Sequence, residues 1–255
     1  MIHERIEGHT AFLTIDNPPA NTWTPEGLHA FRAIVERLDA DRQIYAAVIT
    51  GAGAKFFSAG AELTGFRGDK ALARHFIASF GRAFEALMSS RFVTIAAING
   101  YAMGGGLECT LACDIRIAEA HAQMALPEPA VGLLPAGCGT QNLPWLVGEG
   151  WAKRMILTNE RVDAALALRI GLVQEVVEKG ASLAAAAALA ERVATLSPRA
   201  VEYCKGLIHN ARNGIPRRGG LALERERFID LFDHDDQAEG VNAFLEKRKP
   251  EWKND

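Results

Sequence analysis

The chain has 255 residues, of which 49% are apolar, a composition that suits one large domain or one domain with an appendage. Its net charge of −3 gives no excess of basic residues for nucleic acid or for an anionic membrane surface. The first ten residues lack the basic and apolar pattern of a signal peptide, and no uncharged apolar segment fits a membrane span. We therefore expect a cytoplasmic protein with neither nucleic acid nor a membrane as a partner.

The first fifty residues predict a hairpin, a helix and a buried strand, in that order. Residues 2–7 and 10–15 read as two strands joined by a tight turn. Thr24-Pro25 is typical of a helix start, with proline at the first helical position, and apolar residues then recur at helical spacing. Residues 46–50 are uniformly apolar or β-branched and predict a buried strand, which a loop over 51–63 follows.

The middle of the chain continues this alternation of helix and strand. A helix is predicted over about 69–90, with an apolar face made of Phe76, Phe80, Phe84 and Leu87. A buried strand over 93–98 and a helix over 105–112 follow, and then short strands over 114–118 and 123–126. The long irregular segment 126–142 is rich in Gly and Pro, and such segments in compact domains are usually functional.

The remainder of the chain is predicted to be helical except for one strand over 171–177. Helices are expected over 181–196, 198–212, 221–233 and 235–247, with Ser197-Pro198 as a helix start. Strands alternating with helices, and then helices alone, indicate an α/β core over 1–195 and a helical C-terminal region over 196–255.

Cysteine usage argues against a zinc centre, and we expect no metal. Cys109, Cys113, Cys138 and Cys204 form no C-x-x-C pair and lie in apolar stretches. They are predicted to be reduced, buried thiols.

Two glutamates stand out because each lies in an otherwise apolar stretch. Glu108 is the one charged residue between Phe92 and Cys113, and it follows three consecutive glycines that open a helix. Glu128 lies between two prolines. A buried carboxylate costs several kcal/mol unless it is paired, so each glutamate is either solvent-facing or functional.

The glycine-rich segments beside these glutamates offer backbone N–H groups. The segments are 58–61 and 104–106, and each follows a predicted strand. Two N–H donors from separate loops can stabilise negative charge that develops on a carbonyl oxygen, and two glutamates near them can hold a water and move a proton. Spacing alone does not bring these segments together, so two tight turns without chemistry remain an alternative.

Three segments resemble the signature of the enoyl-CoA hydratase/isomerase superfamily, the crotonases. They are FFSAGAEL (56–63), AAINGYAMGGGLECTLACDIRIA (96–118) and AQMALPEPAVGLLPAGCGTQNL (122–143). The likeness extends over essentially the whole chain. It implies a spiral of ββα units with a C-terminal helical region used in trimer assembly, often as a dimer of trimers.

The resemblance also assigns roles by position. Ala61 and Gly105 match the residues whose N–H groups bind the thioester carbonyl, and Glu108 and Glu128 match the paired glutamates of the true hydratases. For coenzyme A, the matching positions are Lys55, Ala59, Phe228 and Lys247. Coenzyme A would enter as part of the substrate, and no other cofactor is expected.

The family implies an enoyl-CoA hydratase of acyl-CoA catabolism, such as fatty acid metabolism, because many related isomerases and hydrolases lack one of the two carboxylates. A Δ3,Δ2-enoyl-CoA isomerase and a non-catalytic acyl-CoA-binding protein are the alternatives.

The sequence also departs from the family pattern: Ala136 replaces a common Gly, and we expect its N–H still to reach Glu128. Asn142 replaces a common Arg, and Asn159 a common Gly. The acyl chain is left open, although residues between 64 and 90 are expected to line its pocket.

Overall fold

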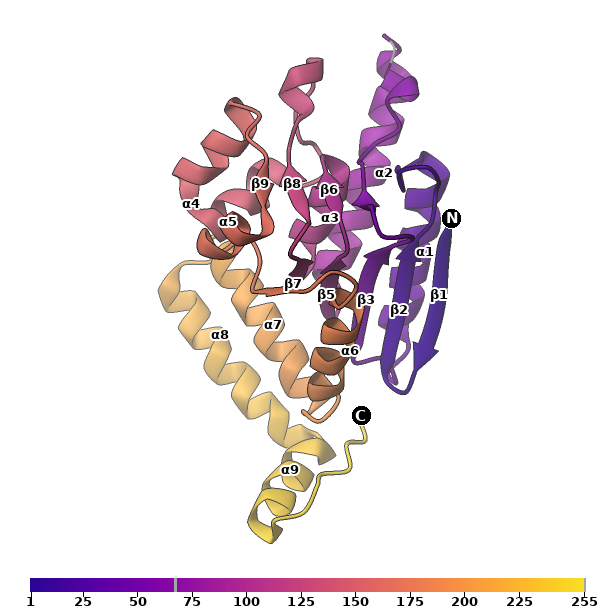
Figure 1. The fold of residues 1–255 in the computed structure, drawn as a ribbon. Helices are drawn as coiled ribbons and strands as arrows, with labels where there is room; N and C mark the ends of the chain where they lie inside the picture. The colour runs from indigo at the N-terminus through magenta and orange to yellow at the C-terminus, as the bar shows by residue number, and fades with distance from the viewer. Residues whose placement is uncertain (67, 255) are drawn as a thin grey trace.

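Two sheets built mainly of parallel strands form the centre of the protein (Figure 1). The structure is a computed structural model, and it describes residues 1–66 and 68–254. The larger sheet has the order β1 (Ile2–Glu7), β2 (Thr10–Ile15), β3 (Ala46–Gly51), β5 (Val93–Ile98), β7 (Ile115–Glu119) and β10 (Glu175–Val177). The smaller sheet has the order β4 (Phe56–Ser58), β6 (Tyr101–Met103), β8 (Gln123–Ala125) and β9 (Val162–Asp163).

The chain passes repeatedly from the larger sheet to the smaller one and then into a helical segment. β3 leads to β4 and α2 (Lys70–Ser89), and β5 leads to β6 and α3 (Gly105–Ala112). β7 leads to β8 and then to the short helix η2 (Glu128–Val131). The crossing from β5 to β6 needs glycine at position 100, because a Cβ atom placed there would lie 2.2 Å from the carbonyl oxygen of Lys55. This connectivity is the predicted spiral of ββα units.

The larger sheet is covered on both faces. On one face α1 (Pro25–Ala40) packs against α2, and the largest fully buried side chains, among them Trp23, Phe31 and Phe84, fill the core there. On the other face α6 (Ser182–Val193) packs against β3, β5 and β7 through small side chains such as Ala186 and Ala190. All eight residues of α3 are buried, so this helix is part of the core and Glu108 is enclosed with it.

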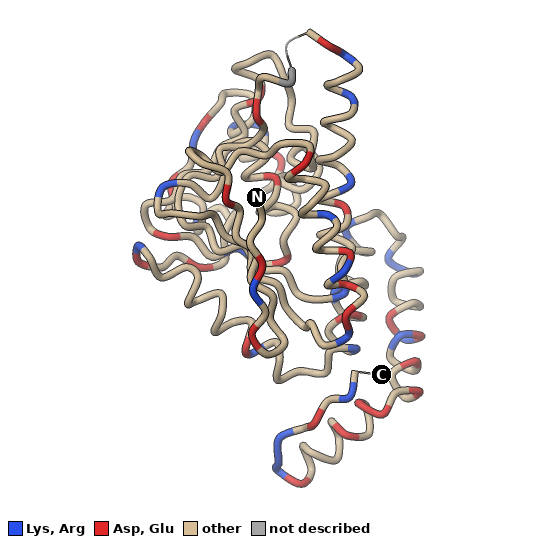
Figure 2. The backbone as a smooth tube through the Cα atoms, turned by 90° about the vertical axis from the view of Figure 1, so that its right-hand side faces the viewer, with Lys and Arg blue, Asp and Glu red and all other residues tan. Residues whose placement is uncertain are grey.

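The remaining elements are helices. They are η1 (Leu63–Phe66), α4 (Gly139–Leu157), α5 (Ala164–Arg169), α7 (Pro198–Arg212), α8 (Arg217–Asp230), η3 (Leu231–Asp233) and α9 (Asp235–Glu246). Figure 2 shows α8 and α9 projecting from the body, with acidic and basic residues interspersed along the helices. Within residues 1–66 and 68–254, no helix combines the length and the apolar character needed to cross a lipid bilayer.

Most predicted elements are confirmed within a few residues, and the differences concern short strands and the ends of elements. The strand predicted over 171–177 is formed only by β10. The hairpin, the strand over 93–98 and the helices over 105–112 and 198–212 have their predicted bounds. The predicted loop over 51–63 contains β4, and β6 and β9 were not predicted. The irregular segment after 126 is shorter than expected, because α4 begins at Gly139, and α8 begins four residues before its predicted start.

One prediction about the cysteines is wrong. Cys109 and Cys113 are buried, but Cys138 is only half-buried and Cys204 is exposed. Cys204 lies on α7, and the pattern of that helix predicted its length without showing which of its faces meets the core.

Candidate active site

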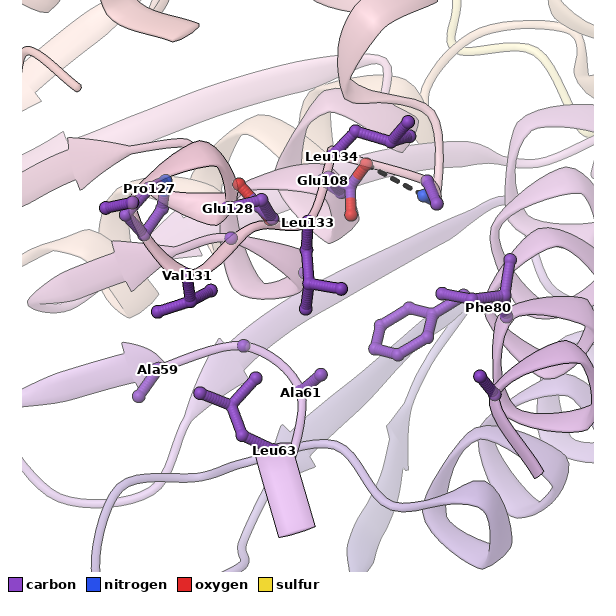
Figure 3. Close-up of a pocket in the computed structure, with 18 of the residues that line it drawn as sticks. Ala59, Ala61, Leu63, Phe80, Glu108, Pro127, Glu128, Val131, Leu133 and Leu134 are labelled. Carbon is purple, nitrogen blue, oxygen red and sulfur yellow. Dashed lines mark hydrogen bonds between the residues drawn. The ribbon is translucent and has the colours of Figure 1, made fainter. Parts of the chain in front are cut away.

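A cavity of about 510 Å³ opens between α2, α3 and two loops. One loop follows β4, and the other runs from the end of β8 to the start of α4. Figure 3 shows Leu63, Leu133 and Phe80 pointing into the cavity from different sides. Its titratable lining groups are Lys70, Arg74, Glu108 and Glu128, and its apolar lining includes Leu63, Ile77, Phe80, Val131, Leu133 and Leu134.

The loop after β4 lies directly against the start of α3. Gly60 has a φ of +94°, and a Cβ atom placed on it would lie 3.2 Å from the backbone nitrogen of Gly105. On the other side of the loop, Trp23 donates its N–H to the carbonyl of Gly60 and accepts the N–H of Glu62. Within residues 1–66 and 68–254 we find no acceptor for the N–H groups of Ala61 and Gly105.

These two N–H groups belong to residues of the cavity wall. Both Ala61 and Gly105 line the cavity, and Gly105 is the first residue of α3, where the helix dipole is positive. Such a pair can donate two hydrogen bonds to one oxygen atom that gains negative charge. The structure therefore brings together the two donors that the sequence analysis selected.

Glu108 is held by a cradle of backbone donors. Its Oε1 accepts the N–H groups of Gly137, Cys138 and Gly139 at 2.8, 2.9 and 2.8 Å. The residue is only 3% exposed, and this burial raises the pKa of its carboxyl group while the three N–H donors oppose the shift. With Oε1 fully engaged, Oε2 is the oxygen left for chemistry in the cavity.

Glu128 lies in a different environment. It begins η2 directly after Pro127, and its carboxylate rests on the backbone of Gly104, where a Cβ atom would lie 2.7 Å from Oε1. Its Oε2 is buried and has no hydrogen-bond partner among the described residues. Burial, and then the nearby charge of Glu108, raise the pKa of Glu128 to about 7. The protein thus holds one carboxyl group by hydrogen bonds and leaves the other free to hold a proton.

The expected contact between the N–H of Ala136 and Glu128 is not observed. The next three residues instead donate their N–H groups to Glu108. The other two departures have local explanations. Asn142 is buried and donates its amide to the carbonyl of Leu111 at 3.1 Å, and Asn159 has a φ of +56°, a conformation that glycine adopts easily.

The predicted coenzyme A contacts are only partly gathered at the cavity. Ala59 lines it, whereas Lys55 is exposed just before β4 and lies over the ring of Phe56. Phe228 lies on α8 with 60% of its surface exposed, and Lys247 caps the end of α9. The helices that carry them, α8 and α9, extend away from α2 and α3, which line the cavity (Figure 1). Within one chain these two residues do not reach the site.

The resemblance led us to expect residues between 64 and 90 in the wall of the acyl pocket, and five residues of α2 do line the cavity: Lys70, Ala73, Arg74, Ile77 and Phe80. The ring of Phe80 lies against the start of α3, where a Cβ atom placed on Gly105 would be 2.6 Å from its Cε1. Sequence reasoning missed the cradle of Glu108, because backbone N–H groups leave no side-chain signal.

Comparison with known proteins gives consistent matches over the whole chain. A family model described as enoyl-CoA hydratase/isomerase matches residues 5–255. The short-chain-enoyl-CoA hydratase of Clostridium acetobutylicum is 36% identical over 96% of this chain and 94% of its own. The crotonyl-CoA hydratase of Syntrophomonas wolfei is also 36% identical, over 98% of each chain.

Solved structures give the same result. The structure of DspI from Pseudomonas aeruginosa is 62% identical and superposes with a TM-score of 0.97 over 99% of this chain and 96% of that one. An enoyl-CoA hydratase from Bacillus anthracis is 33% identical, with a TM-score of 0.96 over 100% and 99% of the two chains.

Proposed function

Because the chain belongs to the enoyl-CoA hydratase/isomerase family and has the crotonase fold, we propose that it is an enoyl-CoA hydratase. The reaction is the reversible syn addition of water to a trans-2-enoyl-CoA thioester. The observation that carries the proposal is one cavity that presents two carboxyl groups and two backbone N–H groups without acceptors among the described residues. The names of the relatives, which include short-chain and crotonyl-CoA hydratases, support it further.

The thioester carbonyl oxygen is placed between the N–H groups of Ala61 and Gly105. As water adds to C3, the electrons of the double bond move toward the thioester and its oxygen becomes an enolate. Fixed N–H donors stabilise this oxygen more strongly in the transition state than in the substrate. Removing one such donor in other enzymes slows the chemical step by about 10²- to 10³-fold.

The two glutamates divide the proton transfers. Glu108, whose Oε1 is held by three N–H groups, takes a proton from water through Oε2 while the water oxygen bonds to C3. Glu128, whose pKa is about 7, gives its proton to C2 as the enolate collapses. The proton on Glu108 then returns to Glu128, so that one water is consumed and the enzyme is restored. The reaction as written uses no metal or redox cofactor, and coenzyme A is part of the substrate.

The test follows the ultraviolet absorbance of the conjugated thioester. Wild type should remove the absorbance of crotonyl-CoA or a longer enoyl-CoA, and Glu108→Gln and Glu128→Gln should each be slower by about 10²-fold or more. An isomerase would instead create absorbance from a 3-enoyl-CoA and would need only one glutamate. Tight binding of acyl-CoA without any turnover would favour a non-catalytic binding protein.

We also propose that the protein acts in the cytoplasm as a homotrimer or a dimer of trimers. The C-terminal helices support this, because α8, η3 and α9 expose a set of large apolar side chains: Phe228, Ile229, Phe232, Val241, Phe244 and Leu245. Large exposed apolar patches mark interaction surfaces. In such an assembly Lys55 and Ala59 of one copy would bind coenzyme A, with Phe228 and Lys247 supplied by another. Light scattering of the purified protein tests the assembly.

A further inference from the structure

One stripe of α2 forms a continuous wall of the cavity. Its members recur at helical spacing, at positions 70, 73, 74, 77 and 80. The stripe is apolar at Phe80, which touches the start of α3, and it becomes basic at Arg74 and Lys70 near the start of α2. A substrate chain that leaves the two N–H donors along this wall therefore meets apolar side chains first.

The opposite wall is apolar as well. Figure 3 shows Leu63 on one side of the cavity and Val131 and Leu133 on the other, all pointing toward the space beside Phe80. These side chains are 52%, 57% and 37% exposed, which is unusual for large apolar residues gathered in one place. Apolar surface of this kind is stabilised when a hydrocarbon covers it.

The length of the apolar wall sets the length of the chain that it can cover. Phe80 and Arg74 are six residues apart, which corresponds to about 9 Å along a helix. An extended chain advances about 1.2 Å per bond, on the scale of an extended backbone. A chain that begins at the two N–H donors thus passes Ile77 and reaches the level of Arg74 after about seven bonds.

We propose that the acyl group of the substrate is an unsubstituted aliphatic chain of about six to eight carbons, covered by Ile77, Leu63, Val131 and Leu133. This inference rests on the proposed function for the identity of the thioester, but its test does not. The five heavy atoms of a crotonyl group take up about 150 Å³, at the roughly 30 Å³ that one water occupies in the liquid. The cavity has about 510 Å³, so a crotonyl group would leave most of it empty and most of the apolar wall uncovered.

Binding of saturated acyl-CoAs to the wild-type protein tests the chain preference without requiring any reaction. We expect the dissociation constant, measured by calorimetry, to fall at least tenfold from butanoyl-CoA to octanoyl-CoA, because each fully buried methylene strengthens binding about fourfold. Beyond eight carbons the gain should drop below twofold per methylene. Equal dissociation constants from four to eight carbons would overturn the proposal.

Lys70 and Arg74 raise the competing possibility of an acyl chain that ends in a carboxylate. If these cations bind a carboxylate at the end of the acyl chain, adipyl-CoA should bind more tightly than hexanoyl-CoA, which would overturn the proposal. We expect adipyl-CoA to bind at least tenfold more weakly, because its charged end would lie about five bonds along the apolar wall. Hydration of the matching enoyl-CoAs then separates the two conclusions. Absence of hydration together with a chain-length preference would refute the proposed function alone, and hydration without the preference would refute this inference alone.

A matched pair of variants on α2 locates the preference. Ile77→Trp fills the apolar wall and should lower the ratio of octanoyl-CoA to butanoyl-CoA affinity at least fivefold. Leu72 lies on the same helix but outside the cavity lining, so Leu72→Trp should leave the ratio of octanoyl-CoA to butanoyl-CoA affinity unchanged. Val131→Ser provides a second test at an exposed position where the fold is not at risk, and it should weaken octanoyl-CoA binding about threefold. If neither cavity variant changes the ratio, the chain does not lie along this wall.

Discussion

The cradle around Glu108 predicts that two substitutions of this residue will have different effects. Glu108→Gln keeps an oxygen where Oε1 accepts the N–H groups of Gly137, Cys138 and Gly139. Glu108→Ala removes that acceptor altogether. Both substitutions remove the proposed proton acceptor, so both should lose activity, but only the alanine variant should also lose stability.

The magnitudes follow from the three hydrogen bonds. A buried N–H left without an acceptor costs about 1–3 kcal/mol, and water from the cavity can partly replace the lost oxygen. We therefore take the lower end of the range, about 3 kcal/mol for the three donors together. In a domain of this size that corresponds to a fall in Tm of about 6–12 °C. Glu108→Gln should cost little stability. Burial raises the pKa of Glu108 because the ionised carboxylate is desolvated, and at pH 8 the neutral glutamine avoids this cost.

The assay combines thermal unfolding with hydration of an enoyl-CoA by the same preparations. We expect Glu108→Gln to keep the wild-type Tm within about 2 °C and to lose about 10²- to 10⁴-fold in kcat. Glu108→Ala should show the same loss of kcat together with the lower Tm. If the two variants were equally destabilised, the carboxylate oxygen would not be the acceptor that stabilises the loop. If Glu108→Gln kept more than a tenth of the activity, Glu108 would not be the base.

Four other predictions concern the acid, the glycine-rich contact and α7. Hydration should slow as the pH rises through 7, because Glu128, with a pKa of about 7, must be protonated to act as the acid; a rate that still climbs at pH 9 would contradict this. Since burial raises this pKa, the ionised form destabilises the fold, and Glu128→Gln should be more stable than wild type to urea above pH 7 but equal to it near pH 4.5. Gly106→Ala should destabilise the protein by about 1–3 kcal/mol or more in urea, because its Cβ would lie 2.2 Å from a backbone carbonyl oxygen of β4; an unchanged midpoint would show that the contact is not tight. Lys205→Met removes an ion pair of 2.8 Å to Asp114, which keeps a contact with His209 at 3.5 Å and two hydrogen bonds from Thr94, so it should cost about 1.5–3 kcal/mol, whereas Lys153→Met, in an exposed pair, should cost less than about 1 kcal/mol; similar costs would contradict the role of burial.

The elements that could be predicted from sequence are those with a long repeating pattern or a clear end signal. The helix α2 has four apolar residues on one face, and α7 begins with Ser197-Pro198, so both were predicted within one residue. The strands β4 and β6 have only three residues each, which is too short for an alternating pattern. They become strands because they pair as neighbours in the smaller sheet. That pairing joins segments far apart in sequence, so a local pattern does not reveal it.

The candidate site could be predicted where it contains residues that are unusual for their sequence surroundings. Glu108 and Glu128 stood out as charges in apolar stretches, and the glycines near Ala61 and Gly105 indicated free backbone donors. What the sequence could not show was that these segments share one cavity, which the resemblance supplied. It also could not show the Glu108 cradle. Every residue near Ala136 has a backbone N–H group, and the residue types do not reveal which of the two glutamates these groups face.

The different surroundings of the two carboxyl groups are what the proposed reaction requires of them. A water can be added only if one group accepts a proton while the other still has one to give, so two identical glutamates would serve poorly. The cradle needs close backbone approach, and glycine permits it, because Cβ atoms at Gly137 and Gly139 would lie 2.9 and 3.1 Å from the carboxylate of Glu108. Among the described residues Glu128 meets no comparable set of donors, and its burial keeps its pKa near 7. The glycine-rich segment before α4 therefore matters for the chemistry, because its three N–H donors stabilise the ionised form of Glu108 as the proton acceptor, whereas burial favours the protonated form of Glu128.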